Sequence, residues 1–230
     1  MSAIAFDLEI AVIPESGASI SPSDRLGISV AAGITDVGHV VIWNGQDESG
    51  PTPAMNATEV RSMLADLSAY DKIVTWNGAQ FDFWVLGVEA DDMESARNLA
   101  RGDKHIDLMM LFCATRRHRL ALKQAAAACG SHKGGGGIES GIDAPALWAQ
   151  GEFTRAIEYV TQDAQATMDV YQHMLDRGGF DWVSKRGNLM MYRTQISQDH
   201  WSVKSLLEMD WPEPDGWITD PVVKDGFTRW

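Results

Sequence analysis

Two acidic side chains stand close together near the start of the chain, in the stretch Phe6-Asp7-Leu8-Glu9. In a β-strand alternate side chains point to the same face, so Asp7 and Glu9 would project together while Phe6 and Leu8 point the other way. The surrounding Ala, Ile and Val residues favour a central strand, where two carboxylates need a cation or another partner. A solvated edge strand is the alternative, and the pair alone is weak support for a metal site.

Two later segments also place an acid beside large apolar residues. In NGAQFD, residues 77–82, Asp82 follows a turn, and an ordinary turn with a helix cap would explain it equally well. In YVTQD, residues 159–163, the four-residue spacing puts the phenol of Tyr159 and the carboxylate of Asp163 on one helix face. An exposed helix pair is the alternative there. Taken in order, the three segments supply four carboxylates and one tyrosine at the same side of a predicted sheet, which chance does not readily produce.

The elements that must position these residues follow an α/β order. We expect three strands, a helix, a fourth strand and a short helix over residues 3–13, 26–35, 40–43, 57–70, 73–76 and 77–90. Residues 91–129 are expected to be mostly helical, and 131–141, with four successive glycines, to form a flexible loop.

The second half contains the clearest helix pattern, from Glu152 to Arg177. Its apolar stripe is expected to face the core: Ile157, Val160, Ala164, Met168, Tyr171 and Leu175. Residues 180–192 predict a hairpin that turns near Arg186 and Gly187. We therefore expect one domain over residues 1–178, which carries the acidic residues and the tyrosine. A hairpin and a Trp-rich extension, residues 179–230, are expected to pack on it. The tryptophans of the extension, Trp201, Trp211, Trp217 and Trp230, follow no period.

The charge distribution bears on the class of partner. The formal net charge is −13, although nucleic-acid binding usually leaves a basic surface. One basic island interrupts the acidity, since residues 97–133 carry 8 Lys and Arg against 2 Asp and Glu. A phosphate track and a solvated helix face explain such an island about equally well. Its members are Arg97, Arg101, Lys104, Arg116, Arg117, Arg119, Lys123 and Lys133.

Composition also bears on the cellular compartment of the protein. No stretch approaches 18 uninterrupted apolar residues, and the start has an acidic centre instead of a basic region followed by an apolar one. Cys113 and Cys129 lack metal-site spacing and predict two reduced thiols. We therefore expect a cytoplasmic protein without membrane contact.

Together FDLE, NGAQFD and YVTQD resemble the three exonuclease motifs of the DEDD superfamily, in its tyrosine-containing branch, which includes the proofreading domains of B-family DNA polymerases. The resemblance covers about residues 3 to 175. Glu158 stands where the sister branch has histidine, so Tyr159 is the matching group. The resemblance implies a ribonuclease H-like mixed sheet whose first three strands are antiparallel, flanked by helices, with the carboxylates above its centre.

The resemblance also implies roles for the residues of the site. Two divalent cations, Mg²⁺ or Mn²⁺, suit hard carboxylate ligands. Asp7 would bridge both ions, Glu9 and Asp163 would bind the ion that carries the attacking water, and Asp82 would hold the second ion directly or through water. Tyr159 would orient that water as a protonated phenol. Leu8, Asn77 and Phe81 match positions that hold the terminal nucleotide, although packing and turn formation explain them almost as well.

The implied activity is hydrolysis of terminal phosphodiester bonds from the 3′ end, with release of nucleoside 5′-monophosphates. The expected substrate is single-stranded DNA, with Arg116, Arg117 and Arg119 among the phosphate contacts, while an exoribonuclease stays open. A non-catalytic nucleic-acid-binding module of the same fold is the main alternative, although retention of all four acids favours an enzyme. A related endonuclease would lack the tyrosine motif. The chain could act alone or with a separate polymerase or another replication or repair partner.

Overall fold

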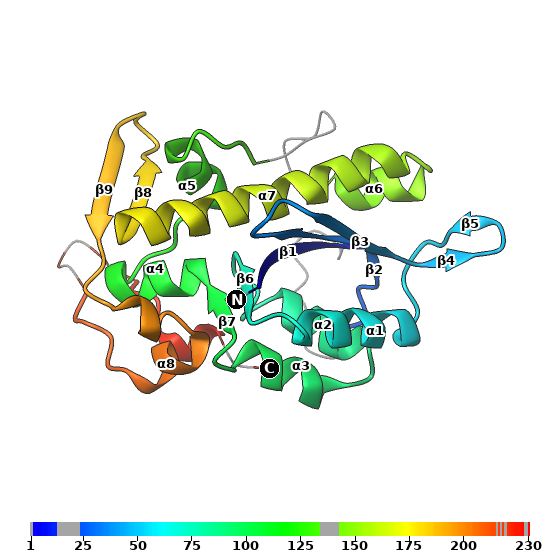
Figure 1. The fold of residues 1–230 in the computed structure, drawn as a ribbon, viewed down its shortest axis with the longest axis horizontal. Coiled ribbons are helices and arrows are strands. Elements are labelled where there is room, and N and C mark those ends of the chain that lie inside the picture. Colours follow the sequence, from blue (N-terminus) through cyan, green and yellow to red (C-terminus); the bar gives the residue numbers. More distant parts are fainter. Residues whose placement is uncertain are drawn as a thin grey trace.

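The centre of the molecule is a five-stranded mixed sheet with the strand order β3-β2-β1-β6-β7 (Figure 1). The first three strands are antiparallel neighbours, and the last two run parallel to the first. Their bounds are β1 (Ala3–Ile10), β2 (Ile28–Thr35), β3 (Val40–Asn44), β6 (Lys72–Thr75) and β7 (His105–Asp107). This confirms the α/β class and the antiparallel start of the sheet. The computed structural model describes residues 2–12, 24–133, 143–214, 216, 218, 220–227 and 230.

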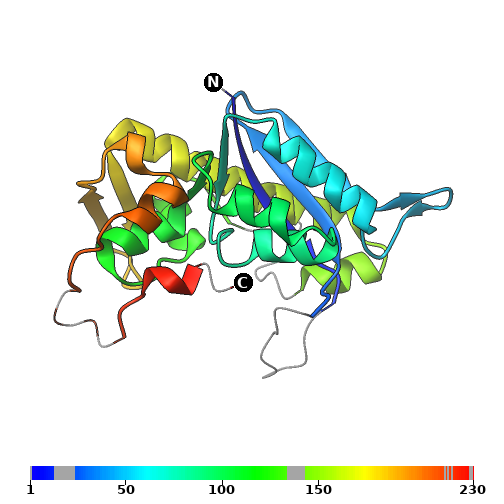
Figure 2. The same cartoon turned by 90° about the horizontal axis from the view of Figure 1, so that it is seen from below.

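Helices cover both faces of the sheet. The long helix α7 (Phe153–Arg177) crosses one face, and α1 (Ala57–Ser68), α2 (Asp82–Glu89) and α3 (Met93–Ala100) lie on the other (Figures 1 and 2). Two hydrophobic clusters result, one on each side of the sheet. The side chains of β1 alternate between the two clusters. The even-numbered side chains join the cluster of α1 and α2, while Ala3 and Ala5 join that of α7.

The helix predicted from Glu152 to Arg177 is present as α7, and it ends at Gly178, whose φ of 70° suits glycine. Most of the predicted stripe is buried, as expected. Ile157 is only partly buried, and Leu175 is the most exposed member of the stripe, with 38% of its surface exposed. The reason is its place in the last turn, where the helix extends past the strands that cover its middle.

The expectation of mostly helical structure over residues 91–129 is confirmed by three helices, but it leaves out one strand that matters for the site. Between α3 and α4 (Leu108–Arg116) the chain forms β7, which pairs with β6 from Ile73 to Thr75. Three residues are too few to show the alternation of a strand, and their hydrogen-bond partners lie about thirty positions earlier in the chain. A shorter helix, α5 (Leu122–Ala128), follows.

The hairpin predicted at residues 180–192 is confirmed as β8 (Gly179–Val183) and β9 (Leu189–Arg193). The last elements are η1 (Gln198–His200), α8 (Val203–Glu208) and η2 (Lys224–Phe227). Trp201 and Phe227 are buried in the cluster beside α7, so the extension packs on the rest of the chain. Trp217 and the glycine run at 134–137 lie outside the described residues.

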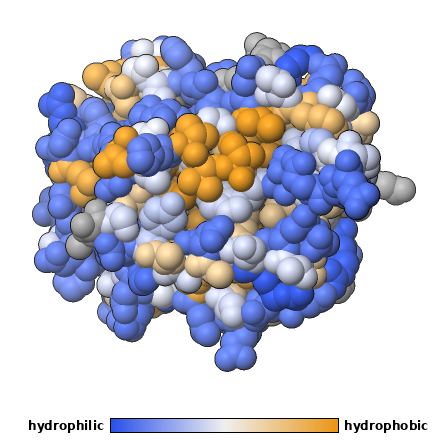
Figure 3. All heavy atoms as spheres, turned by 45° about the vertical axis from the view of Figure 1, so that its right-hand side comes forward, coloured by the Kyte–Doolittle hydropathy of each residue, from blue (hydrophilic) through white to orange (hydrophobic). Residues whose placement is uncertain are grey.

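Three small elements complete the described chain: β4 (Gln46–Asp47), β5 (Gly50–Pro51) and α6 (Ala144–Ala149). The surface is largely hydrophilic on the face seen in Figure 3, with hydrophobic residues gathered near its middle. Cys113 and Cys129 are free thiols. Among the helices that the structure describes, none is both long and apolar enough to span a bilayer.

Candidate active site

The two acids of β1 face α7. Ala3 and Ala5 lie in the hydrophobic cluster beneath that helix, so the odd-numbered side chains of the strand point the same way. Glu9 is buried and Asp7 is partly buried. The strand therefore presents both carboxylates to the helix, as the alternation of the sequence predicts.

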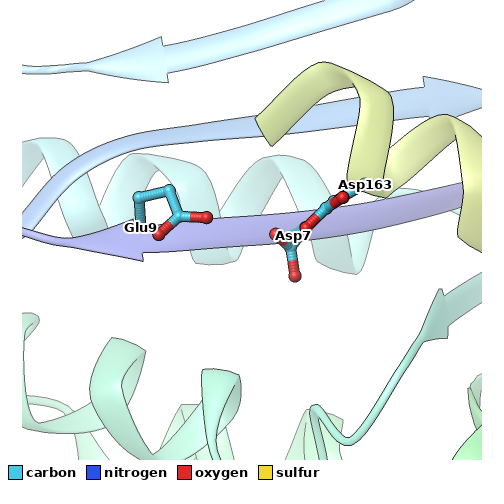
Figure 4. Close-up of side chains that lie close together, drawn as sticks. All are labelled: Asp7, Glu9 and Asp163. Atoms are coloured by element: carbon cyan, nitrogen blue, oxygen red, sulfur yellow. The ribbon is translucent and has the colours of Figure 1, made fainter. Parts of the chain in front are cut away.

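The helix α7 brings a third carboxylate to the strand. Asp163 lies on its buried face, one turn after Tyr159, and the two residues are 1% and 0% exposed. One carboxylate oxygen each from Asp7, Glu9 and Asp163 lies within 4.8 Å of the others. Figure 4 shows these three side chains gathered over β1. Residues more than 150 positions apart in the chain thus form one acidic group.

Asp82 approaches β1 from the side of β6. The pairing of β1 with β6 covers only Ala3–Ala5, so the later backbone of β1 is free to bond with side chains on that side. The N–H of Leu8 donates to the Asp82 carboxylate, and the charge of Asp82 acts on Asp7. Asp82 is buried beside the other acids, but its oxygens lie outside the group of three.

The acids carry unfavourable charge in the metal-free protein. Burial first, and then the charges of Asp163, Asp82 and Glu9, raise the pKa of Asp7 well above its usual value. Burial and Asp163 raise the pKa of Glu9 to about 8. Burial raises the pKa of Asp82 to about 7. A divalent cation would relieve this repulsion, so the chemistry of the donor set fits hard metal ions.

Tyr159 keeps its proton at neutral pH. Burial, followed by the charge of Asp163, raises the pKa of its phenol above the usual value. Its hydroxyl can therefore donate or accept a hydrogen bond without serving as a general base near pH 7. That Tyr159 orients a water molecule stays a prediction.

Lys133 is a member of the site that sequence reasoning counted only as part of the basic island. Its Nζ forms an ion pair with Asp163 Oδ2 and lies 3.4 Å from the hydroxyl oxygen of Tyr159. The contact joins residues thirty positions apart. No local pattern in the sequence marks such a contact, because Lys133 follows a helix end and precedes a glycine run.

Asp107 holds the turn that leads into Asp82, and sequence reasoning did not identify it. Its buried carboxylate accepts hydrogen bonds from the N–H groups of Asn77 (3.1 Å), Ala79 (2.9 Å) and Met110 (2.9 Å). The Asp107 carboxylate thus caps the N-terminus of α4 and also holds the turn after β6 in place. An Asp directly before the apolar run LMMLF is a helix-cap signal, but only the pairing of β7 with β6 brings it to the turn.

The three residues expected to hold the terminal nucleotide have different surroundings. Leu8 is buried in the cluster on the α2 side, and Phe81 is partly buried, with its ring 5.9 Å from that of Trp84. Asn77 has a φ of 75°, and its buried Oδ1 has no hydrogen-bond partner among the described residues. Nucleotide contact by these residues stays a prediction.

The three arginines expected to contact phosphate all lie against the C-terminal extension. Arg117 donates to the carbonyl oxygens of Val222 (3.0 Å) and Pro212 (2.6 Å). The guanidinium of Arg119 lies 5.7 Å from the ring centre of Phe227, and that of Arg116 lies 5.0 Å from Tyr192. These contacts give the arginines a structural task, and phosphate binding by them stays a prediction. Beside them, an open pocket of about 590 Å³ lies between α4 and the extension, and none of the four acids lines it.

Comparisons with known proteins agree with this architecture. In solved structures, the chain is similar to the family B DNA polymerase from the hyperthermophilic archaeon Pyrobaculum calidifontis, with a TM-score of 0.55 and 17% sequence identity. The match covers 76% of this chain and 24% of that polymerase, so the chain corresponds to about a quarter of its length. No curated protein matches the sequence. The model of the RNase H superfamily matches residues 34–175, which is more than half of the chain, and the chain therefore belongs to the RNase H superfamily.

Proposed function

We propose that this protein is a metal-dependent 3′–5′ exonuclease. The observation that carries the proposal is the convergence of Asp7, Glu9 and Asp163 within 4.8 Å, with Asp82 and Tyr159 beside them. Membership of the RNase H superfamily supports a nuclease in general. The direction of attack and the tyrosine-dependent mechanism rest on the motifs FDLE, NGAQFD and YVTQD.

The acids would hold two divalent cations, Mg²⁺ or Mn²⁺. The charges of both Asp82 and Asp163 act on Asp7, which suits a ligand shared by both ions. Glu9 and Asp163 would complete one site and Asp82 the other. When bound, the ions activate a water molecule and stabilise the leaving oxygen of an in-line displacement.

The residues of the chain then have separate tasks. The phenol of Tyr159 holds the attacking water at the phosphorus of the terminal phosphodiester. The new P–O bond forms as the bond to the 3′ oxygen of the preceding nucleotide breaks, and that oxygen takes up a proton. The product is a nucleoside 5′-monophosphate. Asn77 lies at the turn before Asp82, and its side-chain oxygen has no hydrogen-bond partner within the described part of the chain, which suits a hydrogen bond to the terminal nucleotide.

The substrate in this proposal is the 3′ end of single-stranded DNA, and the location is the cytoplasm. The similar structure is that of a DNA polymerase, which favours DNA over RNA. A role beside a separate polymerase or another replication or repair protein is part of this proposal.

A gel assay tests the proposal directly. Single-stranded DNA and RNA of the same sequence, each labelled at the 5′ end in one sample and at the 3′ end in another, are incubated with the protein in Mg²⁺, Mn²⁺ or excess chelator. We expect a ladder of DNA shortened from the 3′ end, mononucleotide products and no cleavage in chelator. Asp7→Ala serves as the control for contaminating nucleases. Internal cleavage would indicate an endonuclease, preferred cleavage of RNA an exoribonuclease, and binding without cleavage a non-catalytic module.

A further inference from the structure

Lys133 places an ammonium group among the carboxylates. Its Nζ is bonded to Asp163 and lies within hydrogen-bond distance of the Tyr159 hydroxyl. The positive charge of Lys133 also acts on Asp7 and Glu9 and opposes the mutual repulsion of the acids. One lysine thus offsets part of the charge of three acids whose oxygens lie within 4.8 Å of one another.

A divalent cation would need the same place. Mg²⁺ binds carboxylate oxygens at about 2.0–2.1 Å, and an oxygen of Asp163 is already occupied by the ammonium group. Two cations beside one buried carboxylate repel each other strongly, because the surrounding protein screens charge less than water does. The ammonium group and the metal ion therefore compete for Asp163.

Lys133 can leave the site without unfolding the protein. Its side chain is 32% exposed, whereas that of Asp163 is 2% exposed. The lysine thus reaches into the acidic group from the surface, and a change of rotamer returns its charge to water.

We propose that Lys133 is an internal counterion that occupies the cation position of the metal-free protein and is displaced when metal binds. This rests on the proposed function, since it takes the acids to be metal ligands. In the metal-free protein Lys133 stabilises the fold by reducing repulsion. During metal binding it acts as a competitor, so it sets the metal concentration at which the site fills.

Calorimetric titration with Mn²⁺ tests the competition. Lys133→Gln removes the charge and should bind Mn²⁺ more tightly than the wild type, by a factor in the range of roughly 5 to 150 that coupled binding typically gives. Lys133→Ala, measured in parallel, should show the same direction, while Lys133→Arg keeps the charge and should stay near the wild type. Lys123→Gln, an exposed lysine of α5, is the control for the change in net charge.

Melting temperature gives a second readout that does not depend on activity. In chelator, Lys133→Gln should melt below the wild type, and saturating Mn²⁺ should raise its melting temperature by more. Equal or weaker Mn²⁺ affinity in Lys133→Gln and Lys133→Ala, with normal binding by the wild type, would overturn the inference alone. A wild-type protein that binds no Mn²⁺ would overturn the proposed function as well.

Discussion

The carboxylates of Asp7, Glu9 and Asp163 meet in surroundings that disfavour their charge. Burial is the largest cause of the raised pKa values of Asp7 and Glu9, and the neighbouring acids add to it. A protein that served only as a scaffold would gain stability by replacing one of them with a neutral residue. The gathering of these acids at one place supports the proposal that they serve a ligand.

Asp7→Asn tests whether this carboxylate lowers the stability of the metal-free fold and serves to bind metal. In chelator at pH 9, where Glu9 with its pKa of about 8 is largely ionised, the variant should melt at a higher temperature than the wild type because one repelling charge is gone. Its response to Mn²⁺ should be weaker. Asp176→Asn, an exposed position on α7, is the control. Strong destabilisation by Asp7→Asn in chelator would mean that the carboxylate is a structural partner.

Tyr159→Phe separates the tyrosine from the metal ligands. The variant keeps the buried ring and removes one hydroxyl, whose proposed task is to position water. Positioned proton-handling groups contribute about 10² to 10⁴ in rate, so kcat should fall by about 10² or less. KM should change little, and the residual activity should still need metal. Asp7→Ala, in contrast, should have no measurable activity. Equal and complete loss in both variants would make Tyr159 an acid–base group or a structural anchor.

Among the elements, the ends of β6 and β7 organise the turn before Asp82. The Nδ1 of His105 lies 2.7 Å from the carbonyl oxygen of Ala100, and its Nε2 lies 2.8 Å from Thr75 Oγ1. Thr75 Oγ1 in turn accepts a hydrogen bond from the N–H of Gly78. A Cβ at Gly78 would lie 2.6 Å from Thr75, so glycine is required at this close approach. Neutral His105, with its proton on Nδ1, completes this chain of hydrogen bonds.

His105 should make stability depend on pH. Burial lowers its pKa from 6.5 to about 4, so its contribution is present above pH 6.5 and is lost as pH falls through about 4. The loss amounts to about 3 kcal/mol, since one pKa unit corresponds to about 1.4 kcal/mol. Urea unfolding of the wild type and His105→Gln between pH 7 and pH 4 should show a smaller decline in the variant, while exposed His39→Gln keeps the wild-type decline. Parallel curves for all three proteins would contradict a neutral, buried His105.

The whole molecule combines a net charge of −13 with a basic island that touches the C-terminal extension. The extension in turn reaches the turn before Asp82, because Gln80 Nε2 donates to the carbonyl oxygen of Gly226 and Trp230 Nε1 donates to that of Ala79. Arg119 donates to Gln80 Oε1. The arginines and the extension thus support the site from outside.

Arg117→Ala separates support of the extension from binding of phosphate. Loss of its hydrogen bonds to Val222 and Pro212 should cost about 1 to 3 kcal/mol, which lowers the melting temperature by roughly 2 to 4 °C per kcal/mol. Lys123→Ala should leave it unchanged. The salt dependence of DNA binding distinguishes the second role, because loss of a phosphate contact flattens it by about one unit of slope. An unchanged melting temperature with a flatter slope would make Arg117 a phosphate contact only.

Local patterns in the sequence determined much of the site. Alternation places Asp7 and Glu9 on one face of β1, and four-residue spacing places Tyr159 and Asp163 on one face of α7, because these periods follow from backbone geometry alone. The three antiparallel strands and the final hairpin have the same kind of local signal. The order of the motifs was enough to indicate that the acids belong together.

Only the tertiary structure decided which distant groups complete the site. The strand β7 exists because β6 supplies its partners, and that pairing carries Asp107 to the turn before Asp82. The ion pair of Lys133 with Asp163 and the contact of Trp230 with Ala79 likewise join positions far apart in the chain. Patterns among neighbouring residues in the sequence do not indicate such contacts. The free energy of these contacts comes from burial and pairing that exist only once the sheet and its helices have assembled.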